Sequence, residues 1–352
     1  MIDVFCRIRS LLSRFKLLLI LVHMHRRLVG RAKFTLYSLV IRITKPKIAL
    51  TYDSRSKPDG VGAQLQRVLA IRSLSNNLRL SYFHTPISSV AIHPLDPYQT
   101  DKQMKAFLGR LNWTFNMEST QDVDQIDRIT LEVQTLTFYS LAQAIIMSKA
   151  RNKLTVISCV EPYRVSEFDP KMFIDILSFL PNFKRVRKEN FNIAVHLRWG
   201  VGGMAIQKGE KISRQMDLIY FVDLLEEVLQ GLTAKSVNVT IYTDAPSGDL
   251  VFNPPPEQHT LWQNSTSFSD GRMSIIGLDL GSQFSRLGVK PKVLRGGDPL
   301  SVIEEMASSD ILVMSRSSLS YVAGILHDSQ NVYFPKSFWH KPLANWHIVG
   351  EK

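Results

Sequence analysis

The sequence predicts an α/β fold in which parallel sheets are flanked by helices on both faces. Short apolar segments of strand length alternate with longer segments of helical periodicity along most of the chain. Strands connected through helices pair in parallel, because each crossover returns the chain to the same edge of the sheet. With 352 residues, 45% of them hydrophobic, the chain is long enough to bury the cores of two domains.

Residues 1–47 are expected to form a basic arm before the first domain. They contain eleven Lys or Arg and one acidic residue, and so carry most of the formal net charge of +12. Their densest apolar run, residues 17–22, is far shorter than the roughly 20 residues that cross a bilayer. Basic segments with interspersed apolar residues are typical of helices on anionic membrane surfaces. We therefore expect peripheral membrane contact here, with a transit or anchor segment and a poorly ordered arm as alternatives.

The first domain is expected at residues 48–180 and opens with a strand–loop–helix–strand unit. Its loop, DGVGAQLQ, places Gly60 and Gly62 where a ligand can approach the helix N-terminus. Leu65 stands at the third glycine position of a dinucleotide-binding fingerprint, which is therefore incomplete. The expected elements are a strand at 48–52, a helix ending near 75, a strand at 80–84, a helix at 131–151 and a strand at 154–159.

A basic stretch that contains a proline, residues 179–190, is expected to link the two domains. The second domain is expected at residues 190–335, followed by a tail at 336–352. One of its helices has its apolar residues on a single face, and another starts with Asp298 as N-cap and proline in the first turn. The expected elements are strands at 193–195, 236–242, 310–314 and 331–334, and helices at 217–232, 298–309 and 319–327.

Polar residues follow three strands of this second domain. His196, Arg198 and Gly200 follow the first strand, Asp244 follows the second, and the sequence SRSS at 315–318 follows the third. The carboxyl ends of parallel strands meet at one edge of the sheet, where ligands of such sheets bind. A guanidinium, glycine amides and a serine-rich helix N-terminus all suit phosphate. We therefore expect a diphosphate at this edge.

Other features define what the site is expected to contain. Ser317 and Ser318 would meet the diphosphate, and Asp244 or Asp298 would accept N–H bonds from a base. The two cysteines have no metal-ligand spacing, and no HExxH or CxxC motif is present. We therefore expect no metal and no cofactor. Because the charge is concentrated in the arm and the rest of the chain is almost neutral, a nucleic-acid partner is not expected.

Three motifs resemble the fucosyltransferase superfamily, whose members make α1,2-, α1,6- and protein O-linked fucose. HLRWG, with Arg198, resembles the HxRxG(D) signature of that family. DPLSVIEEMASSDILVMSRSSLSYVAGIL resembles its later strand and serine-turn signature, and DGVGAQLQ is similar to the glycine–glutamine loop of the α1,2 members. The motifs occur in the order of the family and span residues 50–340, and the chain is most similar to the α1,2 branch.

The resemblance implies two Rossmann-like domains facing a cleft, the GT-B type, with GDP-fucose held by the C-terminal domain and no metal. Arg198 would contact the phosphates, and His196 the guanine or ribose. Ser317 and Ser318 would bind the diphosphate, while Gly60 and Gly62 would line the cleft on the acceptor side. The implied reaction is an inverting transfer of fucose to a hydroxyl of a glycan or lipid-linked glycan.

Some assignments remain open at this point. Glu210, an acid shortly after the phosphate-binding loop, is a candidate general base. Trp199 and Val201 stand where many family members have a second arginine or an aspartate, so a transferase for another nucleotide sugar and an inactive relative stay as alternatives. A nucleic-acid-binding protein is a further, less favoured alternative.

The location is expected to be the cytoplasmic face of a membrane, with a Golgi-type lumen as the alternative. Three Asn-X-Thr sequons would suit a lumen, but such triplets also arise by chance. One of the three sequons starts at Asn238. This residue lies in an expected buried strand, where a glycan would not fit.

Overall fold

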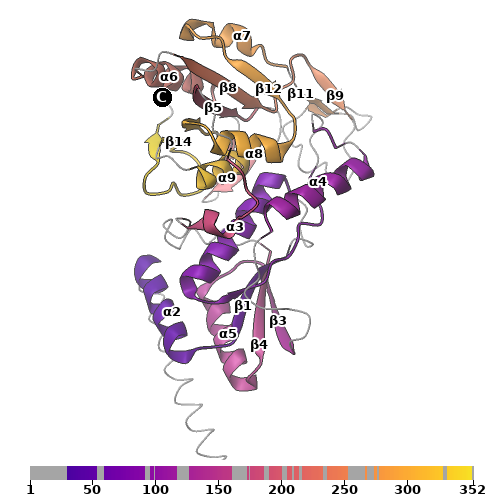
Figure 1. Ribbon diagram of the computed structural model, residues 1–352, viewed down its shortest axis with the longest axis vertical. Coiled ribbons are helices and arrows are strands. Elements are labelled where there is room, and N and C mark those ends of the chain that lie inside the picture. Colours follow the sequence, from indigo (N-terminus) through magenta and orange to yellow (C-terminus); the bar gives the residue numbers. More distant parts are fainter. Residues whose placement is uncertain are drawn as a thin grey trace, which may run out of the picture. The chain divides into compact units, whose positions relative to one another are not determined.

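The computed structural model in Figure 1 describes the greater part of the chain. The described residues are 30–53, 59–91, 96–98, 100–116, 127–160, 173, 175–185, 190–199, 204–207, 210–213, 216–232, 236–252, 266–267, 273–275, 277–327 and 331–350. They divide between two compact units. The first unit consists of Met1–Lys57, Arg67–Pro86 and Asn116–Phe179, and the second of Pro58–Gln66, Ile87–Phe115 and Leu180–Lys352. The expected domain limits at 180 and 190 stay a prediction.

A four-stranded parallel sheet of order β2-β1-β4-β3 organises the first unit. Its central strands β1 and β4 coincide with the expected apolar segments and are almost wholly buried. Helices α3 and α5 are the crossovers, and α2 precedes β1 in the chain (Figure 1). The elements are α2 (Gly30–Thr44), β1 (Ile48–Tyr52), α3 (Val61–Leu78), β2 (Ser81–Tyr82), β3 (Arg128–Val133), α5 (Phe138–Arg151), β4 (Leu154–Cys159) and the short η3 (Ile176–Phe179).

The helix expected at 131–151 was wrong in its first part, because residues 128–133 form strand β3. Exposure alternates along this strand with a period of two, which suits an edge strand and not a helix. Thr137 then ends the extended segment, since its hydroxyl accepts a bond from the Ser140 amide in a capping box. Helix α4 (Asp101–Thr114), in the second unit, was not predicted from the sequence, although Thr100 and Gln103 form a capping box there.

The second unit contains a six-stranded sheet of order β12-β8-β5-β13-β14-β15, in which every neighbouring pair is parallel. If the six strands of this sheet are numbered 1 to 6 in chain order, their order across the sheet is 3-2-1-4-5-6. This is the order of the doubly wound nucleotide-binding fold. The strand order reverses between β5 and β13, which makes this pair the topological switch point. The strands are β5 (Phe191–Leu197), β8 (Val237–Thr243), β12 (Lys292–Arg295), β13 (Ile311–Val313), β14 (Val332–Pro335) and β15 (His347–Val349).

Helices lie on both faces of this sheet, with α6 and α7 on one side and α8 and α9 on the other (Figure 1). The α/β class with parallel sheets and flanking helices is thus confirmed. The helices are α6 (Leu218–Gln230), α7 (Leu280–Gln283), the short η5 (Ser285–Leu287), α8 (Pro299–Ala307) and α9 (Ser318–Leu326). Smaller strands form the β6–β7 hairpin (Met204–Gln207, Glu210–Ser213) and the β10-β11-β9 sheet (Thr266–Ser267, Met273–Ile275, Leu250–Phe252).

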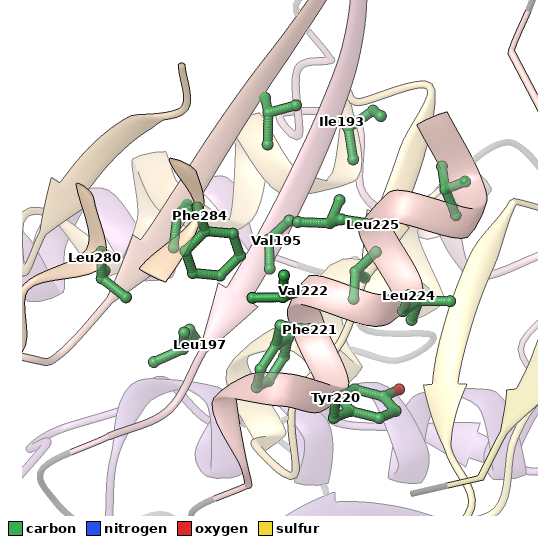
Figure 2. Close-up of a cluster of buried hydrophobic side chains, with 14 of the residues drawn as sticks. Ile193, Val195, Leu197, Tyr220, Phe221, Val222, Leu224, Leu225, Leu280 and Phe284 are labelled. Atoms are coloured by element: carbon green, nitrogen blue, oxygen red, sulfur yellow. The ribbon is translucent and has the colours of Figure 1, made fainter. Parts of the chain in front are cut away.

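Strand β5 divides its residues between the two faces of the sheet. Ile193, Val195 and Leu197 belong to the buried apolar cluster that packs against α6 (Figure 2). Helix α6 contributes Phe221 and Leu225, both fully buried, to the same cluster. Because side chains alternate along a strand, His196 points to the opposite face. The packing of α6 therefore fixes the register that aims His196 away from this core.

Two further comparisons with the sequence prediction concern exposure and membrane spans. Asn238 lies in β8 as expected, but it is exposed, so the argument that burial excludes a glycan there was wrong. Among the described residues, no helix has the length and apolar character needed to cross a membrane.

Candidate functional site

His196 and Ser315 join the two strands of the switch point. His196 is the sixth residue of β5, and Ser315 follows the end of β13. The His196 Nδ1 and Ser315 Oγ atoms lie 2.8 Å apart, within hydrogen-bond distance, and both residues are buried. The crevice outside the carboxyl ends of strands at a switch point is where such sheets bind ligands. This pair therefore marks the edge at which a ligand site is to be sought.

Burial keeps the His196 imidazole neutral. Its removal from water lowers the pKa of His196 to about 4, while the Asp244 carboxylate opposes that shift and the Arg198 guanidinium adds to it. A neutral imidazole has one donor and one acceptor nitrogen, so it can hold the Ser315 hydroxyl in a fixed orientation. The imidazole is then a positioning group in the free protein, and its expected contact with a guanine or ribose stays a prediction.

Arg198 and Asp244 lie at the ends of the neighbouring strands β5 and β8. The Arg198 Nε atom is 3.1 Å from Asp244 Oδ2, and the other carboxylate oxygen accepts a 2.6 Å bond from the Trp199 amide. The side chains are 24% and 11% exposed, respectively. Asp244 thus holds both the guanidinium and the backbone that follows it. The expected contact of Arg198 with the phosphates of a donor stays a prediction.

The turn after β13 is organised by its own serines. The Ser317 amide donates to the Ser315 carbonyl oxygen at 2.8 Å, and the Ser317 hydroxyl accepts from the Leu319 amide at 3.3 Å as the N-cap of α9. Ser318 is the first residue of that helix, where amide groups point out of the N-terminus. Such a terminus favours negative charge. The expected contact of Ser317 and Ser318 with a diphosphate stays a prediction.

Arg316, between these serines, is turned away from the turn. It is buried, and its Nε and Nη2 atoms donate to the Ser337 hydroxyl at 2.9 and 2.6 Å. The sequence analysis assigned no role to Arg316. The structure uses it to tie the turn to the segment after β14.

Gly62 meets the same helix N-terminus. A Cβ built on Gly62 would lie 2.4 Å from the Leu319 amide nitrogen and 2.7 Å from the Ser318 carbonyl carbon. No side chain fits in that space, so glycine is required where the first turn of α3, which belongs to the second unit, approaches α9 so closely. Gly60 differs, because nothing lies within 4 Å of a Cβ built there. Gly62 therefore brings the DGVGAQLQ motif into contact with the serine-turn motif that starts α9.

The glutamines of the DGVGAQLQ loop hold the surrounding chain in place. Gln64 is fully buried, and its Nε2 donates to the carbonyl oxygens of Asp59 and Ser89. The side-chain nitrogen of Gln66 lies 3.1 Å from His340 Nδ1. Both amides act within the second unit, so they fix the first turns of α3, which carry Gly62. The segment expected as a loop is therefore helical from Val61 onward.

The Asp298 carboxylate binds two groups of the protein itself. Its Oδ1 accepts from the Ser301 amide at 3.0 Å, which confirms it as the N-cap of α8, and its Oδ2 forms an ion pair with Arg110 of α4. The expectation that Asp298 accepts bonds from a base stays a prediction. Arg110 was not singled out from the sequence, because nothing in its own segment indicates a partner about 190 positions away.

Arg295 was also missed. It ends β12, and its guanidinium donates to three carbonyl oxygens: Ala245 at 2.7 Å, Pro246 at 3.1 Å and Leu278 at 2.8 Å. These carbonyls lie just after β8 and just before α7. Gly296 and Gly297 follow with φ of 64° and 98°, which non-glycine residues adopt with strain. The paired glycines of the sequence RGGD were the signal that could have indicated this turn.

Trp199 contributes apolar surface beside Arg198. It packs against the core cluster of α6 and borders a cavity of about 550 Å³. Met216, Leu218 and Ile219 line the same cavity together with Arg286. An indole thus stands where the resemblance has a second arginine, so Arg198 lacks a neighbouring guanidinium at that position.

Two predicted site residues fall outside what the structure describes. Gly200 is one of them, and for Glu210 the structure describes the backbone, in β7, but not the side chain. The suggested role of Glu210 as general base stays a prediction. Within the described part of the chain, no three His, Cys, Asp or Glu residues are grouped as ligands of a metal ion.

Comparison with solved structures finds two of POFUT1, a protein O-fucosyltransferase. The structure in complex with GDP has a TM-score of 0.40 and 10% sequence identity, and the match covers 82% of this chain and 97% of that chain. The structure in complex with GDP-fucose has a TM-score of 0.28 and 11% identity, covering 82% and 73%. No family model and no curated protein matches the sequence. Likeness at these scores is weak, and the chemistry of the site rests on the residues of this chain.

Proposed function

We propose that the protein is an inverting glycosyltransferase that transfers fucose from GDP-fucose to a hydroxyl of a glycan or lipid-linked glycan. The observation that carries the proposal is the meeting of three separate motifs at one sheet edge. Gly62 contacts the α9 N-terminus, His196 bonds Ser315 across the switch point, and Arg198 lies on the adjoining strand end. The same three motifs, in the same order, carry the resemblance to fucosyltransferases.

The chemistry follows from the charge that develops during transfer. The acceptor oxygen attacks the anomeric carbon, the bond from that carbon to the β-phosphate oxygen breaks, and its electron pair goes to the diphosphate. The acceptor proton goes to a general base, for which Glu210 remains the candidate. Arg198 and the amides at the start of α9 stabilise the charge on the departing GDP more than on the bound donor. Groups with that preference accelerate the reaction.

Nucleotide selectivity is the first test. A ligand that binds the native state stabilises it, by about 2.7 kcal/mol at a hundredfold excess over Kd. We expect GDP to raise the melting temperature of the protein by several degrees and UDP and ADP to leave it unchanged. A shift with UDP or ADP alone would support the alternative, a transferase of similar fold for another nucleotide sugar.

Turnover is the second test. Labelled GDP-fucose, incubated with the protein and glycan acceptors, should yield labelled product or, slowly, free fucose. Stabilisation by GDP without any transfer or hydrolysis would favour an inactive fucosyltransferase-like protein, which the residues Trp199 and Val201 leave open. Separating binding from turnover in this way distinguishes loss of the donor site from loss of the reaction.

A further inference from the structure

A row of cations lies along the edge of the first unit's sheet at which its strands begin, here called the amino edge. Lys47 precedes β1, Arg79 lies two residues before β2, Lys153 precedes β4, and Arg128 is the first residue of β3. Because the four strands are parallel, their starts meet at one edge. Each strand of the sheet is therefore preceded or started by a basic residue.

More positive charge adjoins this edge. The Lys149 Nζ donates to the Lys45 carbonyl oxygen, and the Lys47 Nζ to the Asn152 carbonyl oxygen, each at 3.4 Å. These bonds bring the last turn of α5, which also contains Arg151, against the start of β1. The amino edge thus gathers basic residues from four separate segments of the chain.

A surface cavity of about 700 Å³ opens at the amino edge. Lys47, Arg79 and Lys153 line it together with Ser81 and Asp127. Asp127 is ion-paired with Lys153 and is 74% exposed, and an exposed pair of this kind is weak. The three cations therefore outweigh the single carboxylate of the cavity, which suits an anionic group.

Three helices end beside this cavity. Lys45, Arg79 and Asn152 directly follow the last residues of α2, α3 and α5, and they have φ of 42°, 57° and 51°. Helices very commonly end in this left-handed conformation. The three turns lead from these helices into β1, β2 and β4 at the amino edge.

Helix α2 adds an apolar surface immediately before Lys45. Tyr37 and Ile41 face inward and are buried, whereas Leu39 and Ile43 are 51% and 71% exposed. Arg42, on the outward side, is exposed as well. Large exposed aliphatic side chains beside cations are typical of helices that lie in the interface of a membrane.

We propose that the amino edge and the outward face of α2 form one docking surface for an anionic phospholipid membrane. The cations would pair with lipid phosphate groups, while Leu39 and Ile43 would enter the boundary between headgroups and acyl chains. The phosphates of a nucleic acid would also pair with the cations, but binding to nucleic acid would leave Leu39 and Ile43 exposed to water. Residues 1–29, directly before α2, contain six Lys or Arg and one acidic residue. The sequence that precedes this surface is therefore also positively charged. The inference is independent of the proposed transferase reaction.

Vesicle sedimentation with the full-length protein tests this surface. We expect binding to vesicles of phosphatidylcholine mixed with phosphatidylserine, and little binding to phosphatidylcholine alone. Removing three cations, as in Lys47→Gln/Arg79→Asn/Lys153→Gln, should weaken binding about a hundredfold, because each basic residue near the surface contributes about fivefold. Asparagine is chosen at position 79 because it tolerates positive φ.

A matched control removes three exposed lysines of the second unit, Lys290→Gln/Lys292→Gln/Lys336→Gln, and should bind as the unaltered protein does. The exposed pair Leu39→Ser/Ile43→Ser should weaken the binding that persists at high salt, and it tests the proposal even if the triple variant fails to fold, which circular dichroism reveals. Equal binding by the amino-edge and control variants would overturn the proposal and assign any binding to the arm. Equal binding to neutral vesicles, or preference for a duplex DNA competitor over vesicles, would overturn it as well.

Discussion

Gly62 approaches Leu319 so closely that a Cβ on the glycine would lie 2.4 Å from the Leu319 amide nitrogen. The two residues are more than 250 positions apart in the chain. Their contact places the first turn of α3 against the N-terminal turn of α9, the turn that we propose binds the diphosphate. The geometry of that turn therefore depends on the absence of a side chain at position 62.

Gly62→Ala should destabilise the protein by about 1–3 kcal/mol, because the new methyl group cannot be accommodated without moving the backbone of α9. Helix propensity alone would give the opposite sign, since alanine is favoured over glycine by about 1 kcal/mol within a helix. Urea unfolding measures the difference. Gly109→Ala is the matched control, because Gly109 also lies in a helix but has nothing within 4 Å of its Cβ position. A stabilising Gly62→Ala would contradict the close contact.

Arg198→Ala should lower kcat about 10²- to 10³-fold, the usual effect of removing one donor to charge that develops in a transition state. The acceptor KM should change little. Arg198→Lys should restore only part of the activity, because an ammonium lacks the planar pair of donors. Steady-state kinetics with GDP-fucose check both variants. Lys292→Ala, which removes an exposed cation at the start of β12, serves as control. Unchanged turnover in Arg198→Ala would remove Arg198 from the site.

Stability should fall as the pH drops from about 6.5 to about 4, because burial lowers the pKa of His196 to about 4. The unfolded state, in which the histidine has its ordinary pKa of about 6.5, binds more protons over that range, so acid favours unfolding. The stability from the neutral imidazole is complete above pH 6.5, and roughly 3 kcal/mol of it is lost by pH 4. His196→Asn should flatten this dependence in denaturant titrations at several pH values. The same slope in the variant would assign the acid sensitivity elsewhere, with His84 as the next candidate, because burial lowers its pKa to about 4 as well.

Asp298→Asn and Asp298→Ala should differ in stability. Asparagine keeps the N-cap of α8 and loses only a half-exposed ion pair with Arg110, so we expect a loss below about 1 kcal/mol. Alanine also removes the cap and should cost about 1 kcal/mol more. Thermal unfolding compares the two. A GDP titration alongside tests the expected base contact, which loss of GDP binding by a stable Asp298→Asn variant would support.

Local signals predicted much of this fold. The buried strands β1 and β4 have the bounds expected from their apolar runs, and α8 begins where Asp298 and proline indicated. Strand β12 was missed because KVLR is short and only half-buried, and β15 because its residues are mostly exposed. In α4 the apolar pattern is weak, and its buried residues Phe107 and Leu111 gain their partners only in the folded chain.

In the candidate site, too, the local features could be predicted from the sequence and the long-range contacts could not. Alternation along β5 predicts that His196 and Arg198 emerge on one side, and the serine turn indicates a helix N-terminus. The His196–Ser315 bond depends on the pairing of β5 with β13. No local sequence pattern determines the order of strands in a sheet, so this bond could not be predicted. The Gly62 contact with α9 and the Arg295 bonds to three carbonyl groups are long-range in the same sense.

Arg295 closes the base of a long excursion of the chain. Its guanidinium binds Pro246 at the point where the chain departs and Leu278 at the point where it returns, and the Leu278 amide donates to the Pro246 carbonyl oxygen at 2.9 Å. The thirty or so residues in between are thus anchored at both ends by contacts that their own sequence does not determine. A segment tethered in this manner can be lengthened, shortened or exchanged while β8 and β12 keep their pairing, which makes it a natural place for new specificity to evolve and for an engineer to graft a foreign loop.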